Sequence, residues 1–287
     1  MQRDMRSRFH LRLLAALAVV MGLAACTIGP AATRGPQTPF PTNAVVRLRD
    51  AIPATLAQGS ADFEFDAIIT GSKTIRYGTA YGGSGSSTLG EPRQMKMTAD
   101  FGALGLGQIE VIVDGARTYL TGGFLDPLLD TGEWVVIDEA SDDPEVVELV
   151  DATGRASDIS IVLYYLYGES GPVVQRPPQT LRGLPAARYA LTLDLDRAAD
   201  EAPVEVRDSL AGYIDTLRET GIERTLDAEV WIQDDGLIHR IILAYSIEPL
   251  KGGGTMRVTY DFVDFGDPVE LVTPAPKKVV PLEKLLR

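Results

Sequence analysis

Few side chains in this sequence could do covalent or acid–base chemistry. The only cysteine is Cys26, which closes the short segment 23–26 with the sequence LAAC. The two histidines are His10 and His239, and one histidine outside the N-terminal segment leaves little material for a Ser-His-Asp triad or a zinc site. The carboxylate pairs at 142–143 and 234–235 fall in expected turns, where carboxylates are usually solvated. We therefore expect no enzyme, no metal site and no cofactor.

The segment 23–26 resembles a bacterial lipobox, in which the cysteine thiol is acylated with a diacylglycerol and the chain is cut before it. A basic stretch and the apolar run 11–21 precede it, which is typical of a secretory signal; the basic residues are Arg3, Arg6, Arg8 and Arg12. That run is too short to cross a bilayer, which takes about 20 apolar residues. An ordinary secretory signal with no role for Cys26 is the alternative. We expect a lipoprotein signal peptide over 1–25 and an acylated Cys26 with chains such as palmitate.

Charge and composition limit the partners. The 287 residues have a net charge of −13, and residues 1–25 hold four Arg and one Asp, so the rest carries about −16. Such an acidic chain does not attract phosphate backbones, which argues against nucleic acid as a partner. Charge would not hold it on an anionic membrane either, so the lipid at Cys26 must be the anchor. Residues 26–43, rich in Pro, Thr and Gly, form the expected flexible tether.

Hydrophobic periodicity predicts the elements of the remaining chain. Apolar residues recur at helical spacing over 44–58, which predicts a helix that Pro53 would kink or end early. Alternation of apolar and polar residues then predicts strands over 62–69, 94–101, 108–114, 117–121, 134–138, 188–195, 226–232, 237–247 and 256–262. Asp114-Gly115 is a strong hairpin turn, whereas Gly82–Ser87 and Gly168–Pro178 are expected to be loops.

Helices interrupt the strands in two places. The first region should hold a helix over 145–152 and a second over 157–167, whose residues are apolar or aromatic nearly all round. A helix of that kind must be buried on every side, in a core or beside an apolar cavity. A third helix over 203–220 has one apolar stripe and should lie on the sheet.

The order of these elements predicts an α+β fold with one large curved antiparallel sheet. No helix follows each strand, as a parallel α/β sheet would require. We expect a half-barrel with helices on its concave apolar face. Its strands offer more apolar surface than the helices obviously cover, which suggests an internal cavity.

Four patches of sequence resemble the LppX/LprG family of actinobacterial lipoproteins, which is related in fold to the LolA and LolB lipoprotein carriers. The patches are the lipobox with its tether, Gly115–Tyr119 with Trp134–Asp138, Gly183-Leu184 with Val230–Ile232 and Asp235–Leu237, and Tyr260–Phe262 with Asp264–Pro268 and Pro274. The resemblance implies a domain over 44–275, followed by a tail over 276–287. It also implies that acylated lipids or glycolipids bind in an apolar cavity and are carried within the cell envelope, on the extracytoplasmic face of the cell membrane. A membrane transporter is then a candidate partner, and the family offers no catalytic residues.

Acyl chains require walls without unmet polar groups, and pockets of this kind are mostly apolar. The candidate wall comprises Phe63, Phe65, Ile109, Val111 and Val113 from strands, Ile159, Val162, Leu163 and Leu166 from the second helix, and Leu210, Tyr213 and Leu217 from the third. Each of them could equally be plain core. If side chains fill the cavity, the alternative function is a regulatory or scaffold lipoprotein of the LolA fold that binds a partner protein and carries no lipid.

Overall fold

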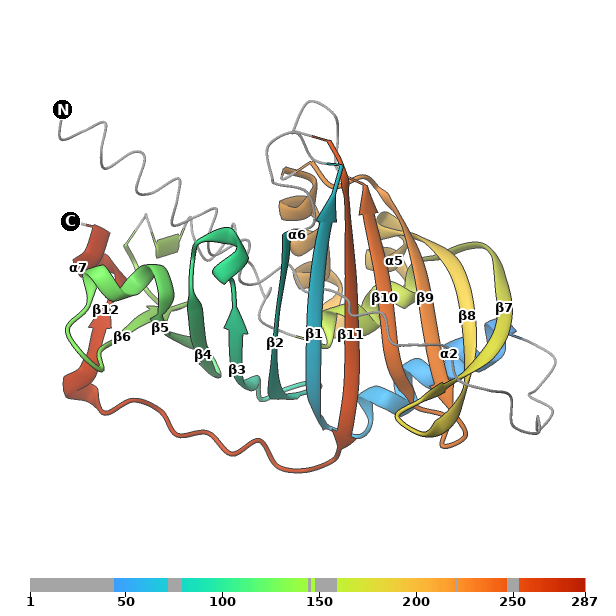
Figure 1. Cartoon of the computed structure of the whole chain (residues 1–287), viewed down its shortest axis with the longest axis horizontal. Helices are drawn as coiled ribbons and strands as arrows, with labels where there is room; N and C mark the ends of the chain where they lie inside the picture. Colours follow the sequence, from blue (N-terminus) through green and yellow to red (C-terminus); the bar gives the residue numbers. More distant parts are fainter. Residues whose placement is uncertain are drawn as a thin grey trace.

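The protein is described by a computed structural model, which defines residues 44–71, 79–143, 146–147, 159–219, 221–246 and 253–286. Twelve strands of these ranges form one sheet in the order β12-β6-β5-β4-β3-β2-β1-β11-β10-β9-β8-β7 (Figure 1). The strands are β1 (Ser60–Thr70), β2 (Thr79–Thr88), β3 (Gln94–Asp100), β4 (Gln108–Asp114), β5 (Arg117–Gly122), β6 (Trp134–Asp138), β7 (Glu169–Leu181), β8 (Leu184–Asp194), β9 (Thr225–Gln233), β10 (Ile238–Ser246), β11 (Thr255–Phe265) and β12 (Val279–Pro281). All neighbours pair antiparallel except β12 and β6, which confirms the predicted α+β class and the large antiparallel sheet.

The two ends of the domain meet in the middle of the sheet. Strand β1, the first of the sheet, lies between β2 and β11 and pairs with both. Phe63 of β1 therefore lies opposite Phe262 of β11. On one side of β1, the strands β2 to β6 follow one another outward in chain order. On the other side, the strands from β11 to β7 follow one another outward in reverse chain order. An extended segment after β11 then passes along one end of the sheet to β12 at the β6 edge (Figure 1). Residues 276–286, which lie in the expected tail, thus form the 3₁₀ turn η5 (Pro276–Lys278), β12 and α7 (Leu282–Leu286).

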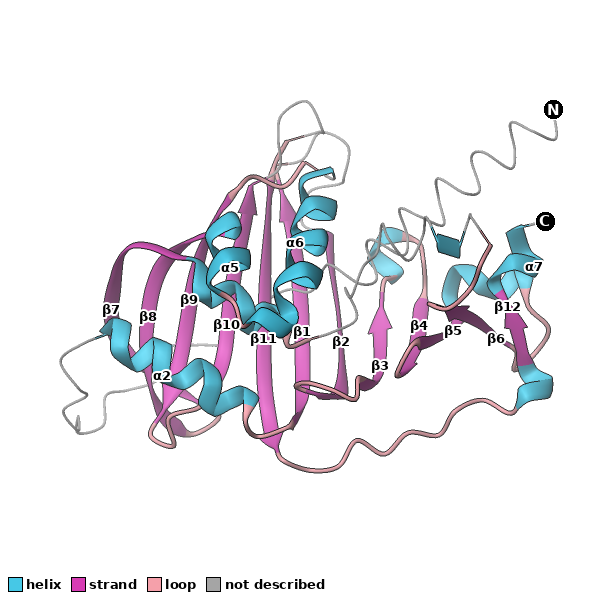
Figure 2. Cartoon of the chain, turned by 180° about the vertical axis from the view of Figure 1, so that it is seen from behind, coloured by secondary structure: helices cyan, strands magenta, loops and turns pink. Residues whose placement is uncertain are grey.

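The longer helices lie on one face of the sheet (Figure 2). They are α2 (Ala44–Leu56), α5 (Leu195–Glu201) and α6 (Val204–Glu219), while shorter helical turns are α4 (Ile161–Tyr164), η1 (Gly102–Leu104), η2 (Gly123–Leu128) and η3 (Tyr165–Gly168). The helices predicted over 44–58 and 203–220 are confirmed as α2 and α6. Pro53 remains inside α2, and Gly59 follows the helix with a positive φ of 80°. The covered face is the apolar one, as predicted.

The segment Gly82–Ser87 is not a loop, as the sequence suggested, but part of β2. It pairs with β1 on one side and β3 on the other, so it lies inside the sheet. A Cβ on Gly83 would lie 2.2 Å from the Thr98 carbonyl oxygen and 2.8 Å from the Phe65 ring. The glycines therefore let the backbone and aromatic rings approach closely, and pairing on both sides overrides the poor β-propensity of Gly and Ser.

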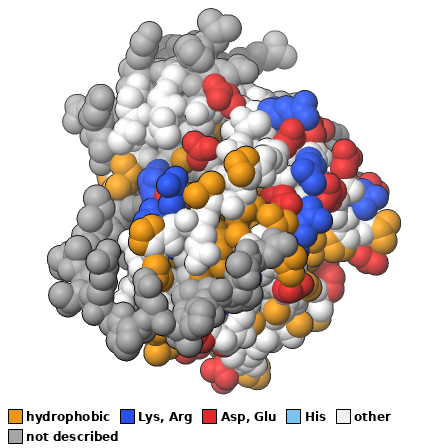
Figure 3. All heavy atoms as spheres, turned by 90° about the vertical axis from the view of Figure 1, so that its right-hand side faces the viewer, with side chains coloured by type: hydrophobic (Ala, Val, Ile, Leu, Met, Phe, Trp, Pro, Cys, Tyr) orange, Lys and Arg blue, Asp and Glu red, His pale blue; other side chains and the backbone are white. Residues whose placement is uncertain are grey.

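The prediction of a loop over Gly168–Pro178 is also wrong, because most of it belongs to β7. This strand lies at the open edge of the sheet and pairs only with β8, with breaks in register between Ser170 and Val174 and between Arg176 and Gln179. Proline is tolerated on an edge strand, where its missing N–H leaves no bond unmade. Figure 3 views this end of the molecule and shows apolar side chains interspersed with acidic and basic ones. Irregular pairing and prolines protect such an edge against adding further strands.

Two further boundaries differ from the sequence prediction. The helix expected over 157–167 is a single α-turn, α4, followed by η3. Leu195, expected to end a strand, instead begins α5, because the Asp194 carboxylate accepts hydrogen bonds from the backbone N–H groups of Asp196 and Arg197 and so caps the helix. Of the helix expected over 145–152, only Val146 and Val147 are described, and both are helical.

Candidate functional site

The five strand residues of the expected wall lie on one face of the sheet. Two rows of paired residues cross β1 to β4, namely Phe65, Gly83, Ala99, Ile109 and Phe63, Gly85, Met97, Val111. Val113 lies two residues beyond Val111 on β4 and so shares its face. None of the five is more than 6% exposed, and they belong to one continuous apolar cluster. Pairing thus joins positions that the sequence could only assign strand by strand.

The seven helical candidates join the same cluster. The described residues of α4 and η3 are buried from Ile161 to Leu166, which confirms that this segment is enclosed on all sides. On α6 the buried stripe runs through Leu210, Tyr213 and Leu217, with Ile214 beside it. Ile159, Val162, Leu163 and Leu166 complete the set, and each is 9% exposed or less. The structure therefore brings all twelve candidates together, and their role as the wall of a lipid cavity stays a prediction.

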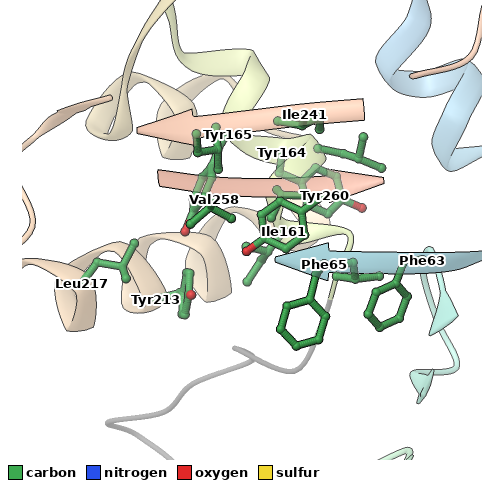
Figure 4. Close-up of a cluster of buried hydrophobic side chains, with 14 of the residues drawn as sticks. Phe63, Phe65, Ile161, Tyr164, Tyr165, Tyr213, Leu217, Ile241, Val258 and Tyr260 are labelled. Carbon is green, nitrogen blue, oxygen red and sulfur yellow. The ribbon is translucent and has the colours of Figure 1, made fainter. Parts of the chain in front are cut away.

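Side chains from the sheet and from the helices face one another (Figure 4). Tyr213 and Leu217 of α6 and Ile161 of α4 point toward the face of β11 and β1, which carries Tyr260 and Phe65 (Figure 4). The Tyr165 and Tyr213 rings lie nearly parallel, with centroids 6.3 Å apart and an interplanar angle of 18°. Helix α6 is thus tied to η3 as well as to the sheet.

The sequence reasoning missed that five tyrosines meet in this interior. They come from β2, η3, α6, β10 and β11, and are Tyr81, Tyr165, Tyr213, Tyr245 and Tyr260. Only Tyr213 was among the predicted wall residues. Burial raises the pKa of Tyr213 to about 12 and raises that of the other four as well. The signal was present, since Tyr245 and Tyr260 share a strand face with the apolar residues Leu243 and Val258, two positions before them.

Charged groups lie on the outer face of β8 to β11, opposite the face that the helices cover. There the Trp231 ring is flanked by the Arg188 and Arg240 guanidinium groups, 5.2 and 5.8 Å from its centroid. Arg188 is held by Glu229 at 2.8 Å, and Arg240 by Asp261 at 2.6 Å. The inner face is thus apolar, whereas the outer face combines these ion pairs with a small apolar cluster of Leu181, Ala186, Trp231 and Ile242.

The histidine outside the N-terminal segment, His239, is partly buried, with 14% of its side chain exposed. Its Nε2 is hydrogen-bonded to the Asp235 carboxylate, which accepts, at 2.8 Å, and its ring lies edge-on to Phe265. Within the described ranges, no group of three His, Cys, Asp or Glu side chains could hold a metal ion, and no helix is long and apolar enough to cross a membrane. Cys26, the signal peptide and the tether lie outside the described residues.

Comparison with known proteins gives likenesses in structure but none in sequence. No protein-family model matches the chain, and no curated protein sequence matches it. Among solved structures, the lipoprotein LppX of Mycobacterium tuberculosis shares 12% identity over 79% of this chain and 97% of its own, with a TM-score of 0.48. LprF of Mycobacterium bovis shares 15% identity over 81% of this chain and 97% of its own, with a TM-score of 0.46. Both are lipoproteins of the type that the sequence resembles, and the chain is similar to them in structure alone.

A third match is the complex of MucA and MucB from Pseudomonas aeruginosa. It shares 14% identity over 82% of this chain and 59% of the matched chain, with a TM-score of 0.33. Because all three identities are at most 15% and all three TM-scores are below 0.5, the function has to be argued from the residues of this chain.

Proposed function

We propose that this protein is a lipoprotein anchored on the extracytoplasmic face of the cell membrane, which binds acylated lipids or glycolipids in its apolar interior and carries them within the cell envelope. The observation that supports the proposal is the single apolar cluster between the sheet and the helices, which extends from α6 and η3 to β5 and β6. The strand side of this cluster is lined by aliphatic and aromatic groups. The ion pairs beside Trp231, Arg188 with Glu229 and Arg240 with Asp261, lie on the outer face of the sheet.

An acyl chain is best held by such a wall. Burial of an unmet polar group beside hydrocarbon costs a few kcal/mol, about 1–3 by protein measurements, so a wall of Phe, Ile, Val and Leu is preferred. Each methylene removed from water contributes about 0.8 kcal/mol, so a long chain that enters the interior is bound strongly without any directional contact. The open sheet offers a wall several strands wide, against which more than one chain could lie side by side.

The proposal is tested most directly on the protein purified from a bacterial membrane. Solvent extraction followed by mass spectrometry should release acyl lipid in near-stoichiometric amount, and the delipidated protein should take up a fluorescent fatty acid. Protein that neither carries nor accepts an acyl chain would contradict the carrier role. In that case the regulatory or scaffold role, with a partner protein and no lipid, becomes the better explanation.

A matched pair of variants on β4 separates a binding wall from plain core. Val111 is 1% exposed on the inner face, and Ile112 is half-buried on the outer face of the same strand. Val111→Trp should reduce fatty-acid binding at least fivefold while the protein still folds, whereas Ile112→Trp should bind as the wild type does. If Val111→Trp instead unfolds the protein by overpacking, which costs about 1–3 kcal/mol or more, the interior is solid at this point.

The anchor is tested by Cys26→Ser in the full chain. Metabolic labelling with an alkyne analogue of palmitate should mark the wild type and not the variant, and the wild type should sediment with membranes. More than one acyl chain is needed for stable attachment, so loss of the cysteine should release the protein. A variant that still sediments with membranes would show that another segment holds it there.

A further inference from the structure

The five buried tyrosines Tyr81, Tyr165, Tyr213, Tyr245 and Tyr260, hereafter the tyrosine cluster, meet where α6 and η3 cover the middle of the sheet. Three of them share the inner face of β2, β11 and β10, around the paired residues Ala67 and Val258. The other two come from the helical side, Tyr165 from η3 and Tyr213 from α6 (Figure 4). None is more than 8% exposed.

The hydroxyls of the tyrosine cluster influence one another electrostatically. The stacked rings of Tyr165 and Tyr213 bring their hydroxyls close enough to interact. Besides burial, repulsion from Tyr213 raises the pKa of Tyr260, and repulsion from Tyr260 and Tyr213 raises that of Tyr245. Phenols influence one another in this way only at short range in a medium of low dielectric constant. All five stay protonated at neutral pH and are therefore hydrogen-bond donors.

Two of these donors are poorly satisfied by the protein itself. The Tyr81 hydroxyl donates to the Met256 sulfur at 3.9 Å, which is a weak acceptor. The Tyr165 hydroxyl is fully buried and has no hydrogen-bond partner of good geometry among the described residues. A phenylalanine would pack equally well without the cost of an unmet hydroxyl. Packing alone thus does not account for the hydroxyl of Tyr165, whereas an acceptor supplied by a ligand would.

The acceptor should be uncharged. The buried charged side chains of the described ranges are Arg93 and Glu169, and each is already paired, Arg93 with Glu139 and Glu169 with Arg49. No buried cation is therefore left in these ranges to meet a phosphate, whose desolvation would be expensive without one. Neutral phenols suit a carbonyl oxygen, the acceptor that every acyl ester carries at the end of its hydrocarbon chain.

We infer that the tyrosine cluster is a polar subsite of the interior, where Tyr165 and Tyr213 donate hydrogen bonds to the ester carbonyl oxygens of a bound acyl lipid. This inference rests on the proposed function and adds to it the chemical group that is recognised. The protein would then distinguish ester lipids from hydrocarbons and from ether lipids of the same length. The rest of the apolar cluster would hold the chains by burial alone.

The test compares two uncharged ligands that differ only in the carbonyl oxygens. Dioleoylglycerol has two ester carbonyls, and the corresponding dioleyl glycerol diether has none. Displacement of a fluorescent fatty acid from delipidated wild-type protein should show the diester bound roughly tenfold more tightly, as expected for about two hydrogen bonds. Tyr165→Phe combined with Tyr213→Phe should bring the diester down to the affinity of the diether and leave the diether unchanged.

Tyr189→Phe is the matched control. The Tyr189 hydroxyl is also buried without a hydrogen-bond partner of good geometry in the described ranges, but it lies on β8 outside the tyrosine cluster. This variant should keep the preference for the diester. Infrared spectra of bound diester labelled with ¹³C at its carbonyls supply a second readout, since the hydrogen-bonded carbonyl band should shift back in the Tyr165→Phe, Tyr213→Phe protein only.

The outcomes separate the inference from the proposed function. Equal affinity of the wild type for diester and diether, or a preference that survives in the double variant, overturns the subsite and leaves lipid binding intact. Binding of neither ligand overturns the proposed function itself.

Discussion

The two halves of the sheet have the same alternation but different inner faces. The covered half, β1 and β7–β11, lies under α2, α5 and α6 (Figure 2), and its inner face carries large aromatic residues such as Tyr189, Tyr245 and Phe262. The aliphatic half, β2–β6 with β12, carries small or aliphatic groups in the corresponding positions, among them Gly83, Ala99, Ile109, Val111, Val113, Leu120 and Val135.

On the proposed function, this difference divides structural and binding roles between the two halves of one sheet. In the covered half, helices pack against rings and contact each other, as Tyr165 and Tyr213 do. In the aliphatic half, the strands beyond β2 carry no member of the tyrosine cluster. The proposed subsite is at the junction, since Tyr81 on β2 is its outermost member. An ester group held there would leave its acyl chains to run along β3, β4 and β5.

Truncation of one leucine in each half should have the largest effect and the clearest contrast. Leu163→Ala in α4 should lower the free energy of unfolding by about 4 kcal/mol, because the side chain is fully enclosed by protein. Leu120→Ala on β5 is equally buried, but the proposed function places acyl chains against it. In delipidated protein it should therefore cost only about 2 kcal/mol, because a side chain that packs partly against a ligand loses fewer protein contacts. Urea denaturation measures both, and equal losses would contradict the division of roles.

A methyl group on β2 should have the next largest effect. Gly83→Ala places a Cβ 2.2 Å from the Thr98 carbonyl oxygen, so strands or the Phe65 ring must move, at a cost of about 1–3 kcal/mol. Gly90→Ala is the control, since nothing lies within 4 Å of its added Cβ, and it should change stability by less than about 0.5 kcal/mol. Thermal unfolding that gives the same midpoint for both variants would show that β2 does not require its glycine.

Loss of the cap of α5 tests the covered half alone. Asp194→Ala should lower the free energy of unfolding by about 1 kcal/mol at pH 7, whereas Asp194→Asn, which still caps the helix, should cost less. A hydrogen bond from Arg224 at 2.8 Å is the main cause that lowers the pKa of Asp194. The ionised Asp194 carboxylate therefore stabilises the folded state fully above the ordinary Asp pKa of about 3.9. This stabilisation is lost as the pH falls through the lower pKa of the folded protein. The difference between wild type and the alanine variant should shrink below about pH 4, and a constant difference would exclude a role for the charge.

The smallest expected effect is that of Tyr165→Phe on the protein without lipid. Removal of a buried hydroxyl without a good partner should leave the free energy of unfolding unchanged or raise it by up to about 1 kcal/mol. Tyr165→Ala, which also removes the ring, should cost about 3–5 kcal/mol by analogy with other large aromatic truncations. Calorimetry on both variants checks this, and a clear loss of stability in Tyr165→Phe would mean that the hydroxyl is satisfied within the protein.

Much of the architecture was predictable because it depends on local patterns. Alternation assigned Phe63 and Phe65 to one face of a strand, and the turn at Asp114-Gly115 joined two strands as expected. The glycine- and serine-rich segment Gly82–Ser87 was missed, because its strand is specified by neighbours on both sides and not by its own propensity. The same holds for β7, whose prolines are compatible with a strand only at an edge.

By itself, the sequence determined which side chains avoid water and on which side of each strand or helix they lie, since period and side-chain chemistry are properties of adjacent residues. Only the tertiary structure decided which of these sides meet. Pairing of β1 with β11, far apart in the chain, brought Phe65 beside Tyr260, and packing of η3 and α6 added Tyr165 and Tyr213. Proximity between distant segments is decided by the packing of the whole chain, and no local period can encode it.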